Sequence, residues 1–244
     1  MVNRVTFRKS VQGFKNNWIL IFTGLIYMAI NIFAIIAVKT LLRGVLSILA
    51  GFIMLVVSSC LISNYLYLLF NIINYNKITM DDFKDGFGYF LRKIYGIFFI
   101  AWIGSYFLSA VLRMAGGNAI LINRVVSIVV LVALNPLPET IYQKHYSSGE
   151  SIRYALEFME ENWLNWLLPN VIFYLILYAI TNTLIVGIFT TYLSIGYDFT
   201  IKRIGGYILG QALFSFSMIY RGHLFKLLST STRRKRRYMD KLYD

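Results

Sequence analysis

The stretch RVVSIVVLVALNPLPE, residues 124–139, is the most irregular apolar run of this chain, and the rest of the sequence can be interpreted from it. It is an apolar run that starts at Arg124 and is broken by two prolines directly before Glu139. Proline removes a backbone donor and breaks a helix. Backbone carbonyls near Asn135 must then find partners inside protein or in water, since lipid offers none. We therefore read the stretch as a short membrane span that closes in a polar break.

The composition around this stretch places the whole chain in lipid. Of 244 residues, 58% are hydrophobic and 14% are charged, against about 25% charged in soluble domains. Uncharged runs long enough to cross a bilayer recur along the chain. We predict an all-α, polytopic integral membrane bundle, with a six-helix domain at 1–228 and a basic tail at 229–244. The expected spans are 18–38, 45–72, 94–112, 119–138, 168–192 and 204–222.

The charge distribution gives a predicted orientation. The net charge is +13, and with six spans most basic residues fall on the side of the two termini. By the positive-inside rule both termini are cytoplasmic, in a cell membrane. A fifth span read as two passes would place the basic run of the tail outside, so parity favours six. That run is expected to contact anionic lipid, at about 1 kcal/mol per charge, and nucleic acid is excluded as a partner. It comprises Arg233, Arg234, Lys235, Arg236 and Arg237.

Three short segments that lead into odd-numbered spans share one apolar spacing, at positions i, i+4, i+7 and i+11, which is typical of a helix. The matching residues are Phe7, Val11, Phe14 and Trp18; Phe83, Phe87, Phe90 and Ile94; and Ile152, Leu156, Met159 and Trp163. Capping boxes are expected at Thr79 and Ser147. The pattern predicts interfacial amphipathic helices, and either a true three-fold repeat or a stripe common to any surface-lying helix.

The segment FKDGFGYF, residues 83–90, enters a span through aromatic and basic residues. In this arrangement, and in the later Pro-Glu break, the chain resembles bacterial six-span membrane proteins of unknown function. That group is related to the membrane domain of glycerophosphodiester phosphodiesterases. The resemblance implies a compact six-helix bundle with both tails inside, and it carries over no catalytic residue.

Sequence motifs for catalysis are missing. His145 and His223 each lack a second metal ligand at usable spacing. Gly116-Gly117 and Gly205-Gly206 are isolated pairs, unlike a phosphate-binding loop. We predict a non-enzymatic protein with no cofactor and no metal.

The remaining candidate binding residues are Asn135, Glu139 and Arg124. A broken helix with a nearby carboxylate is how many transporters build a site. The alternative is that the prolines end the helix at the inner surface, where Glu139 is solvated. Arg124 has a similar alternative, as an interface anchor whose long side chain reaches water.

Two functional classes follow from this sequence. The first is transport-related: a small permease, or the membrane subunit of a complex whose cytoplasmic ATPase grips the interfacial helices at Phe83, Phe87, Leu156 and Met159. The second is a non-transporting membrane protein that acts on envelope integrity, lipid organisation or resistance.

Overall fold

The computed structural model describes residues 2–42, 44–185, 187–193 and 200–230, and every regular element in these ranges is a helix. The α-helices are α1 (Val2–Asn16), α2 (Leu20–Leu41), α3 (Ile48–Tyr75), α4 (Met80–Tyr89), α5 (Leu91–Met114), α6 (Ala119–Ala133), α7 (Leu137–Gln143), α8 (Ser148–Thr181) and α9 (Ile201–Thr230). Two short 3-10 helices, η1 (Gly44–Ser47) and η2 (Gly116–Asn118), join α2 to α3 and α5 to α6.

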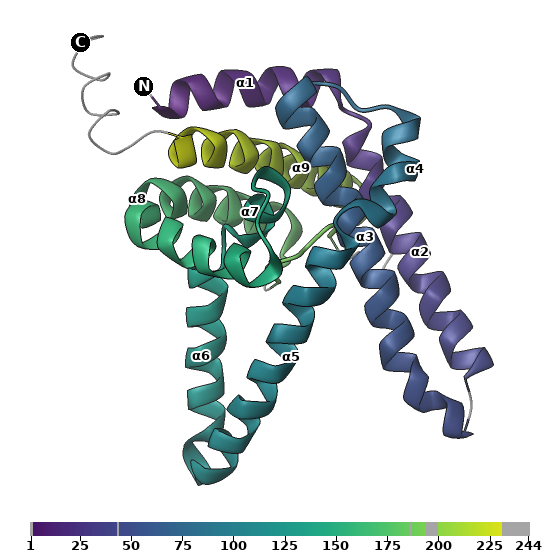
Figure 1. Ribbon diagram of the computed structural model, residues 1–244. Coiled ribbons are helices and arrows are strands. Elements are labelled where there is room, and N and C mark those ends of the chain that lie inside the picture. The colour runs from purple at the N-terminus through teal and green to yellow at the C-terminus, as the bar shows by residue number, and fades with distance from the viewer. Residues whose placement is uncertain (1, 43, 186, 194–199, 231–244) are drawn as a thin grey trace.

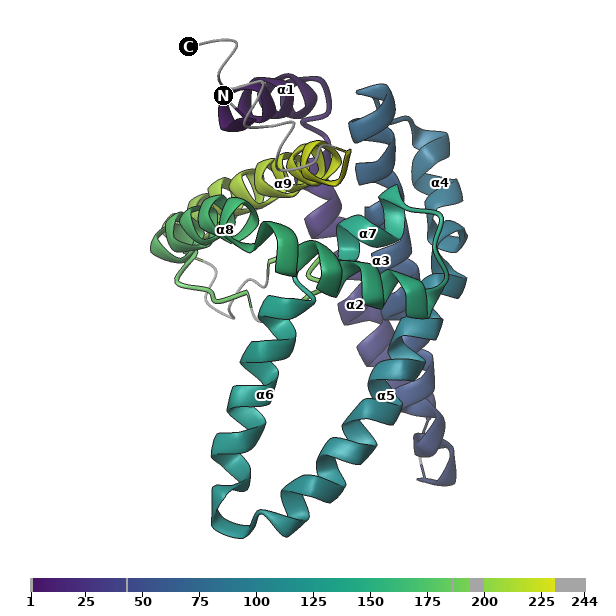
Figure 2. The ribbon, with the colours of Figure 1, turned by 60° about the vertical axis from the view of Figure 1, so that its left-hand side comes forward.

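The helices form two hairpins and a crosswise group. Helices α2 and α3 make one hairpin, α5 and α6 make the other, and both extend to the same side of the molecule (Figure 1). Helices α1, α8 and α9 run across the opposite ends of the hairpins (Figure 2). The short helix α7 lies where α6 meets this crosswise group, so it connects the two parts of the fold.

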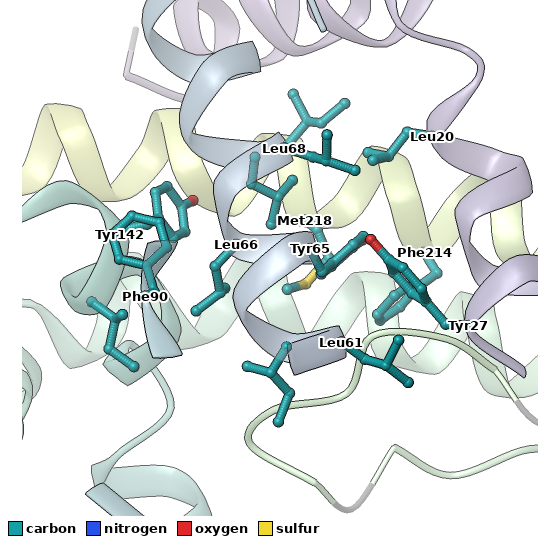
Figure 3. Close-up of a cluster of buried hydrophobic side chains, with 14 of the residues drawn as sticks. Leu20, Tyr27, Leu61, Tyr65, Leu66, Leu68, Phe90, Tyr142, Phe214 and Met218 are labelled. Atoms are coloured by element: carbon teal, nitrogen blue, oxygen red, sulfur yellow. The ribbon is translucent and has the colours of Figure 1, made fainter. Parts of the chain in front are cut away.

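The hydrophobic core lies along the second half of α3. There Leu61, Tyr65, Leu69 and Ile72 are buried, and they pack against Phe214 and other residues of α9. Figure 3 shows the side chains of this cluster, including Tyr27 from α2 and Tyr142 from α7. Helix α3 is thus the element around which α2, α4, α5, α7 and α9 assemble, while α1 packs mainly against α9.

Five helical segments are long and apolar enough to cross a membrane, so the chain is described as a multi-pass membrane protein. They are 20–41, 49–75, 80–114, 116–143 and 148–181. The first four agree in place with predicted spans. Helix α9, the predicted sixth span, is not among the candidates in the described residues. Six spans are therefore not confirmed, and the orientation of the termini stays a prediction.

The predicted fifth span has different limits from those expected. Helix α8 is one 34-residue helix with Pro169 inside it, and it joins the expected amphipathic segment to the expected span. It ends at Thr181, where Asn182 adopts a left-handed conformation with φ of 53°. The predicted helix over 168–192 is wrong beyond Thr181, since residues 182–185 and 187–193 are not helical.

The predicted capping boxes are confirmed. The Thr79 side chain accepts from the Asp82 backbone while the Asp82 carboxylate accepts from the Thr79 backbone, and Ser147 and Glu150 make the same exchange. Each box satisfies backbone donors that the first helical turn leaves free. Helices α4 and α8 therefore begin where the capping boxes predict. That these helices lie in the membrane interface stays a prediction.

Candidate functional site

The polar break after α6 is closed by short backbone hydrogen bonds. Pro136 has no N–H for the carbonyl of Val132, but Asn135 N–H donates to that carbonyl at 3.3 Å. Pro138 likewise has none for Leu134, whose carbonyl accepts from Leu137 N–H at 3.0 Å. The sequence predicts partners for these carbonyls either inside the protein or in water, and for Val132 and Leu134 the partners lie within the chain.

The carboxylate of Glu139, directly after the break, forms a buried ion pair with Arg221 of α9. Arg221 Nε donates to Oε1 at 2.7 Å and Nη2 donates to Oε2 at 2.9 Å. Both residues are almost fully buried, with exposed fractions of 0% for Glu139 and 3% for Arg221. The geometry is the bidentate one that Arg and carboxylates favour. The alternative in which Glu139 is solvated at a surface is therefore wrong.

Arg221 also binds the break itself and α8. Its Nη2 donates to the Asn135 carbonyl at 2.7 Å, and its Nη1 donates to the Tyr174 hydroxyl at 2.6 Å. The guanidinium carbon lies 5.2 Å from the centre of the Trp166 ring, in cation–π geometry. Trp166 Nε1 in turn donates to Asn135 Oδ1 at 2.9 Å. One cation thus connects α7, α8 and α9 through a closed polar network.

Because this network is buried, its effect on stability depends on whether every charged atom has a partner. Removing an ion pair from water is costly, and the attraction between the ions offsets that cost only when the remaining donors and acceptors also have partners. Here both carboxylate oxygens and all three guanidinium nitrogens are bonded. The pair therefore holds α9 in one position against the helix break.

Two tyrosine hydroxyls lie close enough to the pair to interact with it electrostatically. Tyr65 of α3 and Tyr142 of α7 are fully buried, and both interact with Glu139 and Arg221. Neither hydroxyl has a hydrogen-bond partner within the described part of the chain. A buried polar group normally has one, in protein or ordered water.

The surroundings of His223, two residues after Arg221, disfavour its protonated form. Burial, together with the positive charges of Lys9 and Lys226, lowers the pKa of its imidazole to about 4. The imidazole is thus neutral at pH 7.

Two asparagines connect helices through their side chains. Asn64 of α3 accepts from the Tyr27 hydroxyl and donates to the Phe83 carbonyl, so it joins α2, α3 and α4. Asn74, at the end of α3, accepts from Lys226 Nζ of α9 at 2.8 Å.

The predicted site residues fall in separate places. Asn135 and Glu139 meet in the network, but Arg124 is exposed on α6, about 16 Å of helix away by the rise per residue. Phe83 and Phe87 are half-buried, packed against the core. Met159 is buried and Leu156 is exposed, so this stripe is only partly open to a partner. The basic residues Arg233–Arg237 lie outside the described residues.

The functional residues that the sequence did not reveal are Arg221, Tyr174 and Trp166. In the sequence Arg221 lies at the end of the predicted span 204–222, where it is grouped with the basic residues of the C-terminal segment. The sequence does contain a signal that Arg221 is buried. Apolar residues follow it at Leu224, Phe225, Leu227 and Leu228, and the helix continues through them. A lone arginine inside such a helix needs a buried anion, and Glu139 is the carboxylate that lies inside the apolar sequence.

Comparison with known proteins adds no relative: no family model, no curated protein and no solved structure matches the chain. Function is therefore inferred from the geometry of the chain itself.

Proposed function

We propose that this membrane protein has a transport-related role, as the membrane subunit of a larger complex. The observation that carries the proposal is the α5–α6 hairpin. In α5 only Ile94 and Ile97, near its start, are buried, and in α6 no residue of the described helix is buried. Apolar side chains are exposed along the rest of the hairpin, as at Trp102 (64%) and Ile120 (69%). Exposed apolar surface of this extent must be covered by lipid or by another membrane chain.

The state of the ion pair favours a subunit over a stand-alone permease. A substrate site in a broken helix requires polar groups that are open to a ligand. Glu139 and Arg221 instead form hydrogen bonds to each other, and neither is a lining residue of the four cavities of 200 to 480 Å³ that we compared in the described part of the chain. The polar network is thus suited to holding helices together, and transport is proposed for the assembly.

The charged faces of α4 and α8 supply a surface for a water-soluble subunit such as an ATPase. Asp81, Lys84 and Asp85 of α4 are exposed, as are Arg153 and Glu157 of α8. Since Phe83 and Phe87 pack inward, these charged side chains, rather than the aromatic stripe, are the proposed contacts. Rim charges of this kind mainly set partner choice and association rate.

The test is purification of the tagged full chain from its native membranes, followed by measurement of ATP hydrolysis in the purified complex. We expect associated ATPase activity that is lost in the double variant Lys84→Glu/Arg153→Glu. The matched control is Arg113→Glu/Arg124→Glu, which makes the same change of charge on the exposed α5–α6 hairpin and should retain the activity. Purification without any ATP-hydrolysing partner would contradict the proposal. It would favour the non-transporting role in envelope integrity or lipid organisation.

A further inference from the structure

A cavity at the ends of three helices contains a group of positive charges that neither the ion-pair network nor the proposed complex uses. It lies where α3, α7 and α9 end, and its volume is about 480 Å³. Lys144, His145 and Lys226 line it together with the polar side chains of Asn74 and Gln143. We propose that this cavity binds a phosphate group, carried either by a lipid headgroup or by a free phosphate compound.

The charge of the lining carries the first step. No carboxylate lines this cavity, and within the described residues neither Lys144 nor Lys226 forms an ion pair with one. Glu157 and Glu161 line a neighbouring cavity that shares Ser229 and Thr230 with this one. Two ammonium groups without an anion attract one, and a lysine ammonium is a common phosphate ligand.

The positions of the two lysines are fixed by the protein. Lys226 Nζ donates to Asn74 Oδ1 at 2.8 Å, which leaves two of its three N–H groups for a ligand. Lys144 Nζ lies 5.3 Å from the centre of the Tyr154 ring. Burial lowers the pKa of the Lys144 ammonium, because it disfavours the charged form. A bound anion would stabilise that charged form again. Less conformational entropy is lost when pre-positioned side chains bind.

The other lining residues favour a phosphate ester over inorganic phosphate. Ser229 and Thr230 add hydroxyl groups, whereas Phe70 and Tyr75 add an aromatic wall with ring centres 6.2 Å apart. A phosphate ester has both a charged group for the lysines and a less polar part for this wall. The chain continues from Thr230 into the basic run at 233–237, so further positive charge follows the cavity in sequence.

The test uses the full chain in two settings. In a neutral maltoside detergent, the unfolding temperature is followed during titration with inorganic phosphate, against chloride at the same ionic strength. In nanodiscs, the unfolding temperature is compared between phosphatidylcholine alone and mixtures with phosphatidylglycerol. The pocket variant is Lys144→Gln/Lys226→Gln, and the matched control is Lys15→Gln/Lys77→Gln, which removes two exposed lysines outside the cavity.

We expect saturable stabilisation of the wild type and the control, with an apparent affinity about tenfold or more weaker in the pocket variant, since charge-assisted hydrogen bonds are lost. A response in detergent identifies a free phosphate compound as sufficient, and a response in nanodiscs alone identifies the lipid headgroup. The charge-retaining variant Lys144→Arg/Lys226→Arg should keep the response and shows that the cavity tolerates substitution. If the pocket variant responds like the control in both settings, the proposal is wrong.

Discussion

The junction of α7, α8 and α9 and the α5–α6 hairpin are built on opposite principles. At the junction, side chains are buried and polar groups such as Glu139 and Arg221 satisfy one another. Along the hairpin, the backbone N–H and C=O groups form hydrogen bonds within each helix, and most apolar side chains are exposed. The junction is therefore stabilised by contacts within this chain, whereas the hairpin depends on the lipid or protein that surrounds it. Matched substitutions in the two regions test this comparison.

The largest effect is expected for the arginine of the junction. Arg221→Met leaves Glu139 buried without a partner, which costs about 3 to 5 kcal/mol. The free energy of unfolding, measured in mixed detergent micelles, should fall by this amount. The control Arg124→Met, on the exposed face of α6, should change it by no more than about 0.5 kcal/mol. Adding Glu139→Met to Arg221→Met should recover part of the loss, and equal effects of the two single variants would contradict the comparison.

A smaller effect is expected from acid. In the unfolded chain His223 takes up a proton near its ordinary pKa of about 6.5, whereas in the fold its pKa is about 4. Between these values only the unfolded state gains the proton, so stability falls as the pH drops from 7 to 4, by roughly 2 kcal/mol after allowance for partial exposure. A pH series of unfolding free energies on His223→Gln should lack this component. The exposed residue His145 provides the control, since His145→Gln should retain it.

The next effect concerns close packing at the junction. A Cβ added to Gly222 of α9 would lie 2.6 Å from the Tyr142 hydroxyl and 2.7 Å from a side-chain carbon of Ile73. Gly222→Ala should therefore destabilise the fold by about 1 to 3 kcal/mol through overpacking. At Gly104 of α5 a Cβ meets nothing within 4 Å, so Gly104→Ala should be neutral or stabilise by up to about 1 kcal/mol. Thermal unfolding of both variants measures the difference, and a neutral Gly222→Ala would contradict it.

The smallest effect is expected on the hairpin. Trp102→Ala removes a side chain that is 64% exposed, so the unfolding free energy of the isolated chain in detergent should change by no more than about 0.5 kcal/mol. Retention of partner chains on purification from native membranes is measured in parallel. A large loss of stability in the isolated chain would show that the hairpin packs within the chain after all.

Local features of this fold could be predicted from the sequence. The capping boxes at Thr79 and Ser147 depend on residues three positions apart, and both are present. The break at Pro136 follows from proline chemistry alone, and it directed attention to Asn135 and Glu139.

Features that depend on distant residues could not be predicted in the same way. The partner of Glu139 lies 82 positions later, and no periodicity connects the two. The stripe through Phe83 and Phe87 shows that α4 covers something apolar, but not whether that is α3 or another protein. Apolar composition likewise does not separate a span from a buried helix, so the predicted sixth span at α9 is left unconfirmed.

The separation of Glu139 and Arg221 also has a consequence for biosynthesis. At 5 to 20 residues per second, translation from Glu139 to Arg221, which lies 82 positions later, takes about 4 to 16 seconds. During that interval α6 and α7 have been made, but the carboxylate has no counter-ion. The nascent chain can therefore form this ion pair only after Arg221 of α9 has been synthesised. A chain truncated before Arg221 has an unpaired carboxylate at Glu139.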